Sequence, residues 1–221
     1  MSSIDSPPLR SPEVAEQSSL FFESLQVLKS PRYFFTSLVI FLVTAFMVKV
    51  GLSMVIPGSY LVNGLFWPHA GFALATLFLS GKKYIPALMG GLLAGVYVPG
   101  LPVFFWVGYA VSYTTGALVA ACFLRRSEDF SSSLEKIRDV GQLMLALVIS
   151  SLISSLLLSS LFITTFSNVP WEEFFRIWLS QWASDGIGIL IFAPVVLVWT
   201  VETKVRWDNR QFFEVLGWLL I

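Results

Sequence analysis

Asp185 is the most informative polar residue of this 221-residue sequence, because it lies inside a long apolar stretch. Trp178, Gln181 and Trp182 precede it by seven, four and three residues. This spacing places two indole rings, an amide and a carboxylate on one face of a helix. Because an ionisable side chain inside a membrane is costly unless it is paired or hydrated, we interpret these residues as the lining of a ligand cavity.

Two further ionisable residues, Lys49 and His69, lie within apolar stretches and are expected at depths related to that of Asp185. All three can therefore converge on one cavity. In the alternative, Asp185 pairs with Lys49 or His69 and only braces the helices. Lys49 can also extend outward to water, and His69 can cap carbonyls that Pro68 leaves free. A carboxylate facing acyl chains, or one satisfied by its neighbours with no space beside it, would exclude a ligand site.

The sequence lacks the usual catalytic and metal-binding motifs. It has one histidine and one cysteine, Cys122, far apart, and no zinc-protease, CxxC or P-loop pattern. We therefore predict no catalytic residue, no metal site and no cofactor. The formal net charge is zero and the basic residues are dispersed, so no nucleic-acid partner is predicted either.

The elements that must position these residues are membrane-spanning helices. Hydrophobic residues make up 56% of the chain and charged residues 13%, which is outside the usual range of soluble domains. Twelve of the 14 Lys and Arg residues fall in four short polar segments, separated by paired apolar runs. Cytoplasmic loops are enriched in Lys and Arg, so the N-terminus and every basic segment are expected in the cytoplasm. The basic residues of these segments are Arg10, Lys29, Arg32, Lys82, Lys83, Arg125, Arg126, Lys136, Arg138, Lys204, Arg206 and Arg210.

The apolar runs predict an all-α, polytopic transmembrane helix bundle with six complete spans and a truncated seventh. Residues 1–32 are expected to form a cytoplasmic segment with an amphipathic helix, or else a partly ordered tail. Residues 33–200 would form the bundle, and residues 201–221 a cytoplasmic link and the start of a further span. The predicted spans are about Tyr33–Ile56, Tyr60–Ser80, Tyr84–Val98, Pro102–Leu124, Val140–Phe166 and Phe174–Thr200.

Several motifs, taken in order, resemble the first type of membrane-associated sensor domain, the input domain of bacterial sensor histidine kinases and diguanylate cyclases. The most specific are Trp67-Pro68-His69-Ala70-Gly71 and the run from Trp182 to Leu190, which continues to Ala193-Pro194 and Trp199. Tyr84-Ile85-Pro86, Leu124-Arg125-Arg126 and Ile137-Arg138-Asp139-Val140 add weaker matches. The resemblance covers the chain from about the second span to its end.

One departure from this family lies in the fourth span, where Tyr113 and Gly116 stand at places that usually carry Asn and Glu. The role of that Glu cannot be transferred, but the tyrosine hydroxyl can supply a neutral hydrogen-bonding group. The candidate ligand-binding residues are therefore Asp185, Trp182, Gln181, Trp178, His69, Trp67, Lys49 and Tyr113.

The resemblance implies a multi-pass sensor of the bacterial inner membrane that detects a small ligand or a membrane state and signals to a cytoplasmic output domain absent from this chain. Its expected partners are the lipid bilayer, an unidentified small molecule and a second copy, joined through the missing output domain. One alternative is a substrate-binding membrane subunit of a small-solute transporter. Another is a structural anchor, which the small residues Ala87, Gly91 and Gly95 would favour.

Overall fold

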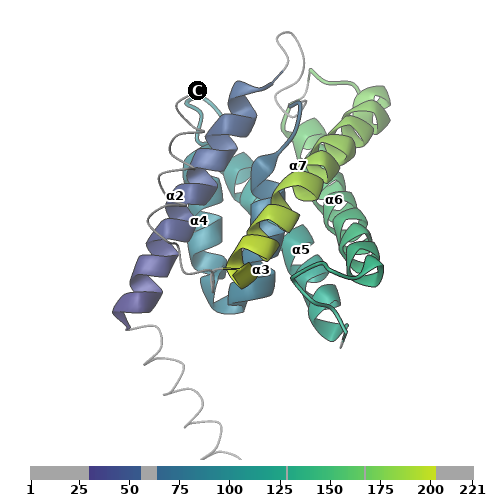
Figure 1. Ribbon diagram of the computed structural model, residues 1–221. Coiled ribbons are helices and arrows are strands. Elements are labelled where there is room, and N and C mark those ends of the chain that lie inside the picture. Colours follow the sequence, from purple (N-terminus) through teal and green to yellow (C-terminus); the bar gives the residue numbers. More distant parts are fainter. Residues whose placement is uncertain (1–29, 56–63, 128, 167, 203–221) are drawn as a thin grey trace, which may run out of the picture. The chain divides into compact units, whose positions relative to one another are not determined.

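The computed structural model of the protein describes residues 30–55, 64–127, 129–166 and 168–202. Every regular element in these ranges is a helix, and Val55 and Gly64 form an isolated bridge (Figure 1). The all-helical class is confirmed. The predicted N-terminal amphipathic helix and the segment from residue 203 onward lie outside the described residues.

Four of the described helices are long and apolar enough to cross a membrane. A helical crossing needs about 20 residues. The four helices, with 23, 24, 29 and 29 residues, are α2 (Pro31–Ser53), α5 (Val103–Arg126), α6 (Ile137–Thr165) and α7 (Phe174–Glu202). Large apolar side chains such as Phe46, Leu156 and Leu190 remain exposed along them, as lipid-facing side chains do.

Two helices are shorter than a crossing. α3 (Pro68–Ser80) has 13 residues, and α4 (Ile85–Val96), which follows a 3-10 turn η1 (Lys82–Tyr84), has 12. The predicted span Tyr60–Ser80 is therefore wrong as one continuous helix, because its described residues before Pro68 are not helical. The predicted span Tyr84–Val98 agrees with α4 to within two residues at either end.

For α3 the reason is the proline at its start. Proline has no N–H to bond within a helix and a φ suited to the first turn, and it disfavours helical geometry in the residue before it. Accordingly Trp67 is extended, with φ −116° and ψ 91°, and α3 begins at Pro68. Pro86 is the second residue of α4, and Ile85 before it is helical, with φ −51° and ψ −45°, so this proline does not set where α4 begins.

The helices pack within the unit that begins at Ile40. α5 contacts α3, α4 and α6, and α7 lies against both α3 and α6 (Figure 1). Glycines allow the closest approaches. A Cβ on Gly116 of α5 would lie 2.6 Å from the Ser150 carbonyl oxygen of α6, and one on Gly91 of α4 would lie 2.6 Å from the Phe41 carbonyl oxygen of α2. The packing role predicted for Gly91 is therefore confirmed.

Candidate functional site

The Asp185 carboxylate is buried at the meeting point of three helices. Its Oδ1 accepts hydrogen bonds from the Tyr113 hydroxyl at 2.8 Å and from Gln181 Nε2 at 3.0 Å. Its Oδ2 accepts one from Ser154 Oγ at 2.7 Å. Gln181 Nε2 also donates to the Tyr113 hydroxyl oxygen, at 2.8 Å. We call these four residues the carboxylate cluster; each is at most 2% exposed.

The helices position this cluster in two ways. Gln181 and Asp185 lie one turn apart on α7, so helical periodicity alone brings them together. Tyr113 comes from α5 and Ser154 from α6, so these contacts depend on how the three helices are rotated against one another. The hydrogen bonds from Tyr113 and Ser154 therefore join α7 to α5 and to α6.

Neither Lys49 nor His69 pairs with Asp185. Lys49 is exposed, and its Nζ donates to the Tyr97 carbonyl oxygen at 3.0 Å. The Nε2 of His69 is hydrogen-bonded to the Tyr109 hydroxyl at 3.0 Å. The alternative in which Asp185 pairs with one of them is therefore wrong, and so is a capping role for His69 at the start of α3. The partners of the carboxylate in the described part of the chain are neutral.

His69 nevertheless belongs to the same buried region. Its side chain is fully buried, and its ring lies edge-on to the Tyr113 ring, with centroids 4.3 Å apart. Trp67 also packs against His69, with centroids 5.6 Å apart. His69 thereby brings α3 into contact with the carboxylate cluster through an aromatic ring.

The extended residues before α3 are tied to α7 through Ser184. The Trp67 backbone N–H donates to the Ser184 carbonyl oxygen at 3.3 Å. The Ser184 hydroxyl donates to the Gly64 carbonyl oxygen at 2.6 Å. These bonds pair backbone groups that lie outside any helix. Irregular backbone at membrane depth is stable only when its polar groups are paired in this way.

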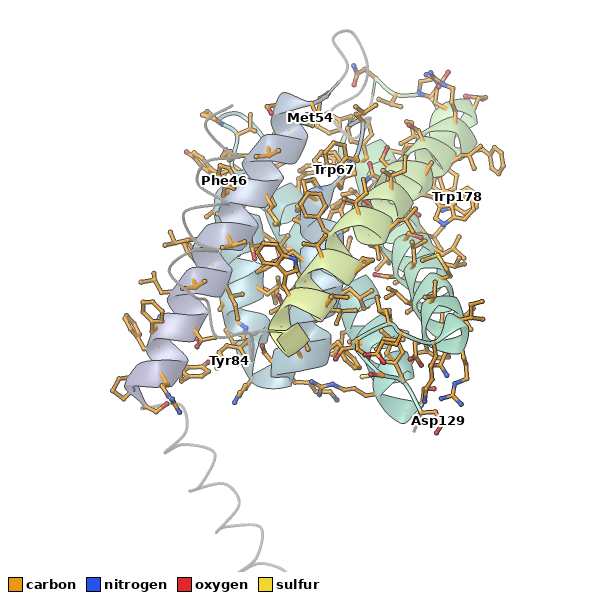
Figure 2. All side chains as sticks on the ribbon, viewed as in Figure 1. Phe46, Met54, Trp67, Tyr84, Asp129 and Trp178 are labelled. Carbon is orange, nitrogen blue, oxygen red and sulfur yellow. The ribbon has the colours of Figure 1, made fainter. Side chains whose placement is uncertain are left out.

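Trp178 and Trp182 lie apart from the cluster. Their rings stack with centroids 6.4 Å apart and an interplanar angle of 15°, and both side chains are partly exposed. Trp67 lies inside the bundle, whereas Trp178 projects from its surface (Figure 2). Of the residues predicted on one face of this helix, Gln181 and Asp185 are in the core and the two tryptophans border it.

Several buried polar atoms in this region have no hydrogen-bond partner among the described residues. They include the indole Nε1 of Trp67, the Nδ1 of His69 and the Oε1 of Gln181. Buried polar groups in proteins are usually paired, so each such atom requires an explanation. Together they offer one donor, one acceptor and an imidazole nitrogen whose role depends on its tautomer.

Sequence reasoning missed two contributors. Ser154 is one of six serines on α6, and periodicity alone does not distinguish the one that reaches Asp185. Tyr109 is the hydrogen-bonding partner of His69 but was not included in the predicted set. Both are polar residues in apolar spans. Such residues are too common in this sequence to identify these two as parts of the site.

Comparison with known proteins yields a family. The family model MASE1 matches residues 32–220, nearly all of the chain. No curated protein and no solved structure matches it.

Proposed function

The chain belongs to the MASE1 family, whose members are membrane-associated sensory input domains of signalling proteins, and from this we propose that it detects a small ligand or a membrane state for a bacterial inner-membrane signalling protein. The output would be a histidine kinase or diguanylate cyclase domain beyond these residues. Such an output domain would join two copies of the chain as a homodimer.

The carboxylate cluster is the observation that carries this proposal. It links α5, α6 and α7 through hydrogen bonds to one buried carboxylate, and His69 adds α3 by contact with the ring of Tyr113. A stimulus can change the output only if it stabilises one helix arrangement over another. A stimulus that displaces one member of the cluster alters the partners of the other helices, so the cluster is suited to convert it into helix movement.

The proposed ligand site is the inner part of this region. All three hydrogen bonds of Asp185 come from neighbouring side chains, which meets the first of the two conditions, satisfaction by neighbours and no space beside it, that together exclude a ligand site. A ligand that bonds to the carboxylate must therefore replace one of these donors. The unpaired Nε1 of Trp67 and Oε1 of Gln181 are nearby groups that need no such exchange. A small polar molecule that accepts from the indole and donates to the amide fits this chemistry. Trp178, Trp182 and Lys49 would border the site.

We also propose the finer topology: six crossings and the start of a seventh, with the N-terminus in the cytoplasm. The short helix α3 would complete its crossing with the extended residues Gly64–Trp67, whose backbone is bonded to α7. The Arg125 side chain donates to the Phe78 carbonyl oxygen, which joins the end of α5 to the end of α3. The basic residues after both helices therefore lie at one end, as the enrichment of Lys and Arg on the cytoplasmic side requires.

The test is Asp185→Asn in the full-length protein, with the basal kinase or cyclase output measured in membranes. Asparagine replaces one acceptor oxygen by an NH2 group, which cannot accept a hydrogen bond from Ser154 or from Tyr113 and Gln181, so we expect the output to change by about fivefold or more, with normal membrane insertion. Asp129→Asn is the control, because Asp129 is exposed and paired with Arg138 outside the bundle core.

Wild-type output and an unaltered response to stimulus in Asp185→Asn would overturn the proposed site. Uptake of solute by proteoliposomes containing the protein would instead support the transport alternative.

A further inference from the structure

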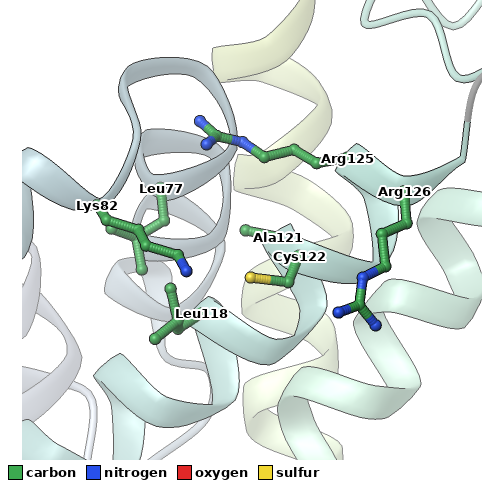
Figure 3. A pocket seen from close by; sticks show the side chains of 7 residues that line it. All are labelled: Leu77, Lys82, Leu118, Ala121, Cys122, Arg125 and Arg126. Atoms are coloured by element: carbon green, nitrogen blue, oxygen red, sulfur yellow. The ribbon is translucent and has the colours of Figure 1, made fainter. Parts of the chain in front are cut away.

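A pocket of about 260 Å³ lies between the ends of α3 and α5, away from the carboxylate cluster. Figure 3 shows Lys82, just after α3, and Cys122 of α5 reaching toward this space from opposite sides. A water molecule takes up roughly 30 Å³ of the liquid, so the pocket has room for a group several times larger. Its lining residues are Leu77, Lys82, Leu118, Ala121, Cys122, Arg125 and Arg126.

The pocket is strongly basic. Lys82, Arg125 and Arg126 contribute three positive charges, and none of the described residues that line it is acidic. The other loop arginine of this region, Arg138, is paired with Asp129. Arg125 uses its Nε and Nη2 on the Phe78 carbonyl oxygen, at 3.0 and 2.5 Å, which holds its guanidinium beside the pocket.

An anion is favoured even though two helices end here. A helix C-terminus carries about −0.5 of a charge, so the ends of α3 and α5 together oppose an anion with about one unit. Three full positive charges from Lys82, Arg125 and Arg126 exceed this. The balance of charge at the pocket is therefore positive.

Part of the pocket lining is apolar. Leu77 of α3 and Leu118 and Ala121 of α5 form it, at the point where the apolar helices give way to basic residues. Lipid headgroups lie at this boundary of a membrane protein, and basic pockets between helices are suited to anionic headgroups. A free phosphate ion would use the charges but not the apolar wall.

From these observations we propose that the pocket binds the phosphate group of an anionic membrane lipid. The phosphate lies among Lys82, Arg125 and Arg126, and the glycerol and the first acyl carbons lie on Leu77 and Leu118. This site shares no residue with the proposed sensory site, so one can fail while the other stands.

The experiment compares lipid binding to the full-length protein, delipidated in detergent and titrated with phosphatidylglycerol or phosphatidylcholine, by native mass spectrometry. The test variant is Lys82→Gln/Arg126→Gln, which leaves the Arg125 contact with Phe78 in place. The control is Arg138→Gln, which removes one basic residue outside the pocket. Each lost charge is expected to weaken phosphatidylglycerol binding about fivefold, with phosphatidylcholine unchanged.

Equal phosphatidylglycerol binding by the wild type and the double variant would overturn the proposal. An equal loss in Arg138→Gln would do the same, because it would indicate a diffuse surface effect. A parallel titration with inorganic phosphate distinguishes a lipid phosphate from a free phosphate ion as the ligand. One result would show that the ligand is a free anion and that the lipid proposal is wrong. In that result the wild type binds inorganic phosphate and the double variant does not, but both proteins bind phosphatidylglycerol equally.

Cys122 provides a second measurement that needs no variant. It is the single cysteine of the sequence and it lines the pocket. An anionic lipid in the pocket should slow alkylation of Cys122 by a small maleimide in nanodiscs that contain phosphatidylglycerol, relative to nanodiscs of phosphatidylcholine alone. Equal alkylation rates in the two kinds of nanodisc would contradict the proposal.

Discussion

The Tyr113 hydroxyl donates to Asp185 Oδ1 across 2.8 Å, joining α5 to α7 inside the bundle. By resemblance, Tyr113 and Gly116 stand where related domains usually carry Asn and Glu. A Cβ at Gly116 would lie 2.6 Å from the Ser150 carbonyl oxygen, so a longer side chain there requires α5 and α6 to move apart. In this chain the two helices approach closely and the tyrosine supplies the polar link.

Tyr113→Phe should destabilise the protein by about 1–3 kcal/mol, because it leaves two buried hydrogen-bonding groups with fewer partners. Oδ1 of Asp185 would keep one donor, Gln181 Nε2. Tyr97→Phe is the matched control: Tyr97 is 52% exposed, so its loss should change stability by less than about 0.5 kcal/mol. Thermal unfolding in detergent measures both. Equal effects of the two substitutions would contradict the assigned bond.

Ser154→Ala tests the second oxygen of the carboxylate. It removes the donor at 2.7 Å from Asp185 Oδ2 and should cost about 1–3 kcal/mol. Ser160→Ala, on the same helix, removes only an exposed bond to the Leu156 carbonyl oxygen and should change stability by less than about 0.5 kcal/mol. The melting temperatures of the two variants give the comparison, and no difference between them would exclude the Ser154 contact.

Gly188→Ala should disrupt the contact between α7 and the residues before α3. The added Cβ would lie 2.0 Å from the Trp67 carbonyl oxygen, and backbone on both sides leaves no flexible group to yield. Overpacking of this kind costs about 1–3 kcal/mol or more.

Gly186→Ala, two residues earlier, is the control for that substitution. Its Cβ would meet only Leu147 Cδ2 at 3.6 Å, an ordinary contact. Because alanine favours helix over glycine by about 1 kcal/mol, this variant should be as stable as the wild type or more so. Equal melting temperatures for the Gly188→Ala and Gly186→Ala proteins would show that Gly188 does not approach the Trp67 carbonyl oxygen this closely.

Cysteine labelling tests the proposed topology. In a Cys122→Ser background, Glu172→Cys before α7 should react with a membrane-impermeant thiol reagent in intact spheroplasts. Glu135→Cys before α6 should react only after the membrane is opened. Both positions are exposed in the structure, so access from the correct side is sufficient for reaction. The reverse pattern would invert the proposed orientation.

Helical periodicity predicted what lies along one helix and little of what lies between helices. The proximity of Gln181 to Asp185 follows from their spacing. The chemistry of proline explains the start of α3 at Pro68, although we predicted one span running through it. The partners from α5 and α6 depend on how the helices are rotated, which no residue spacing specifies. The basic character of Lys49 suggested a partner for Asp185, but the structure places its amine on the Tyr97 carbonyl oxygen instead.

The two bonds of Ser184 have a mechanical consequence. One residue of α7 accepts from the Trp67 N–H and donates to the Gly64 carbonyl oxygen, so α3 cannot slide lengthwise along α7 without breaking both. We expect α3 and α7 to move as one rigid unit during signalling. α5 and α6 would then move relative to this unit. Their links to α7 at Asp185 are side-chain hydrogen bonds, which can exchange partners without breaking backbone hydrogen bonds.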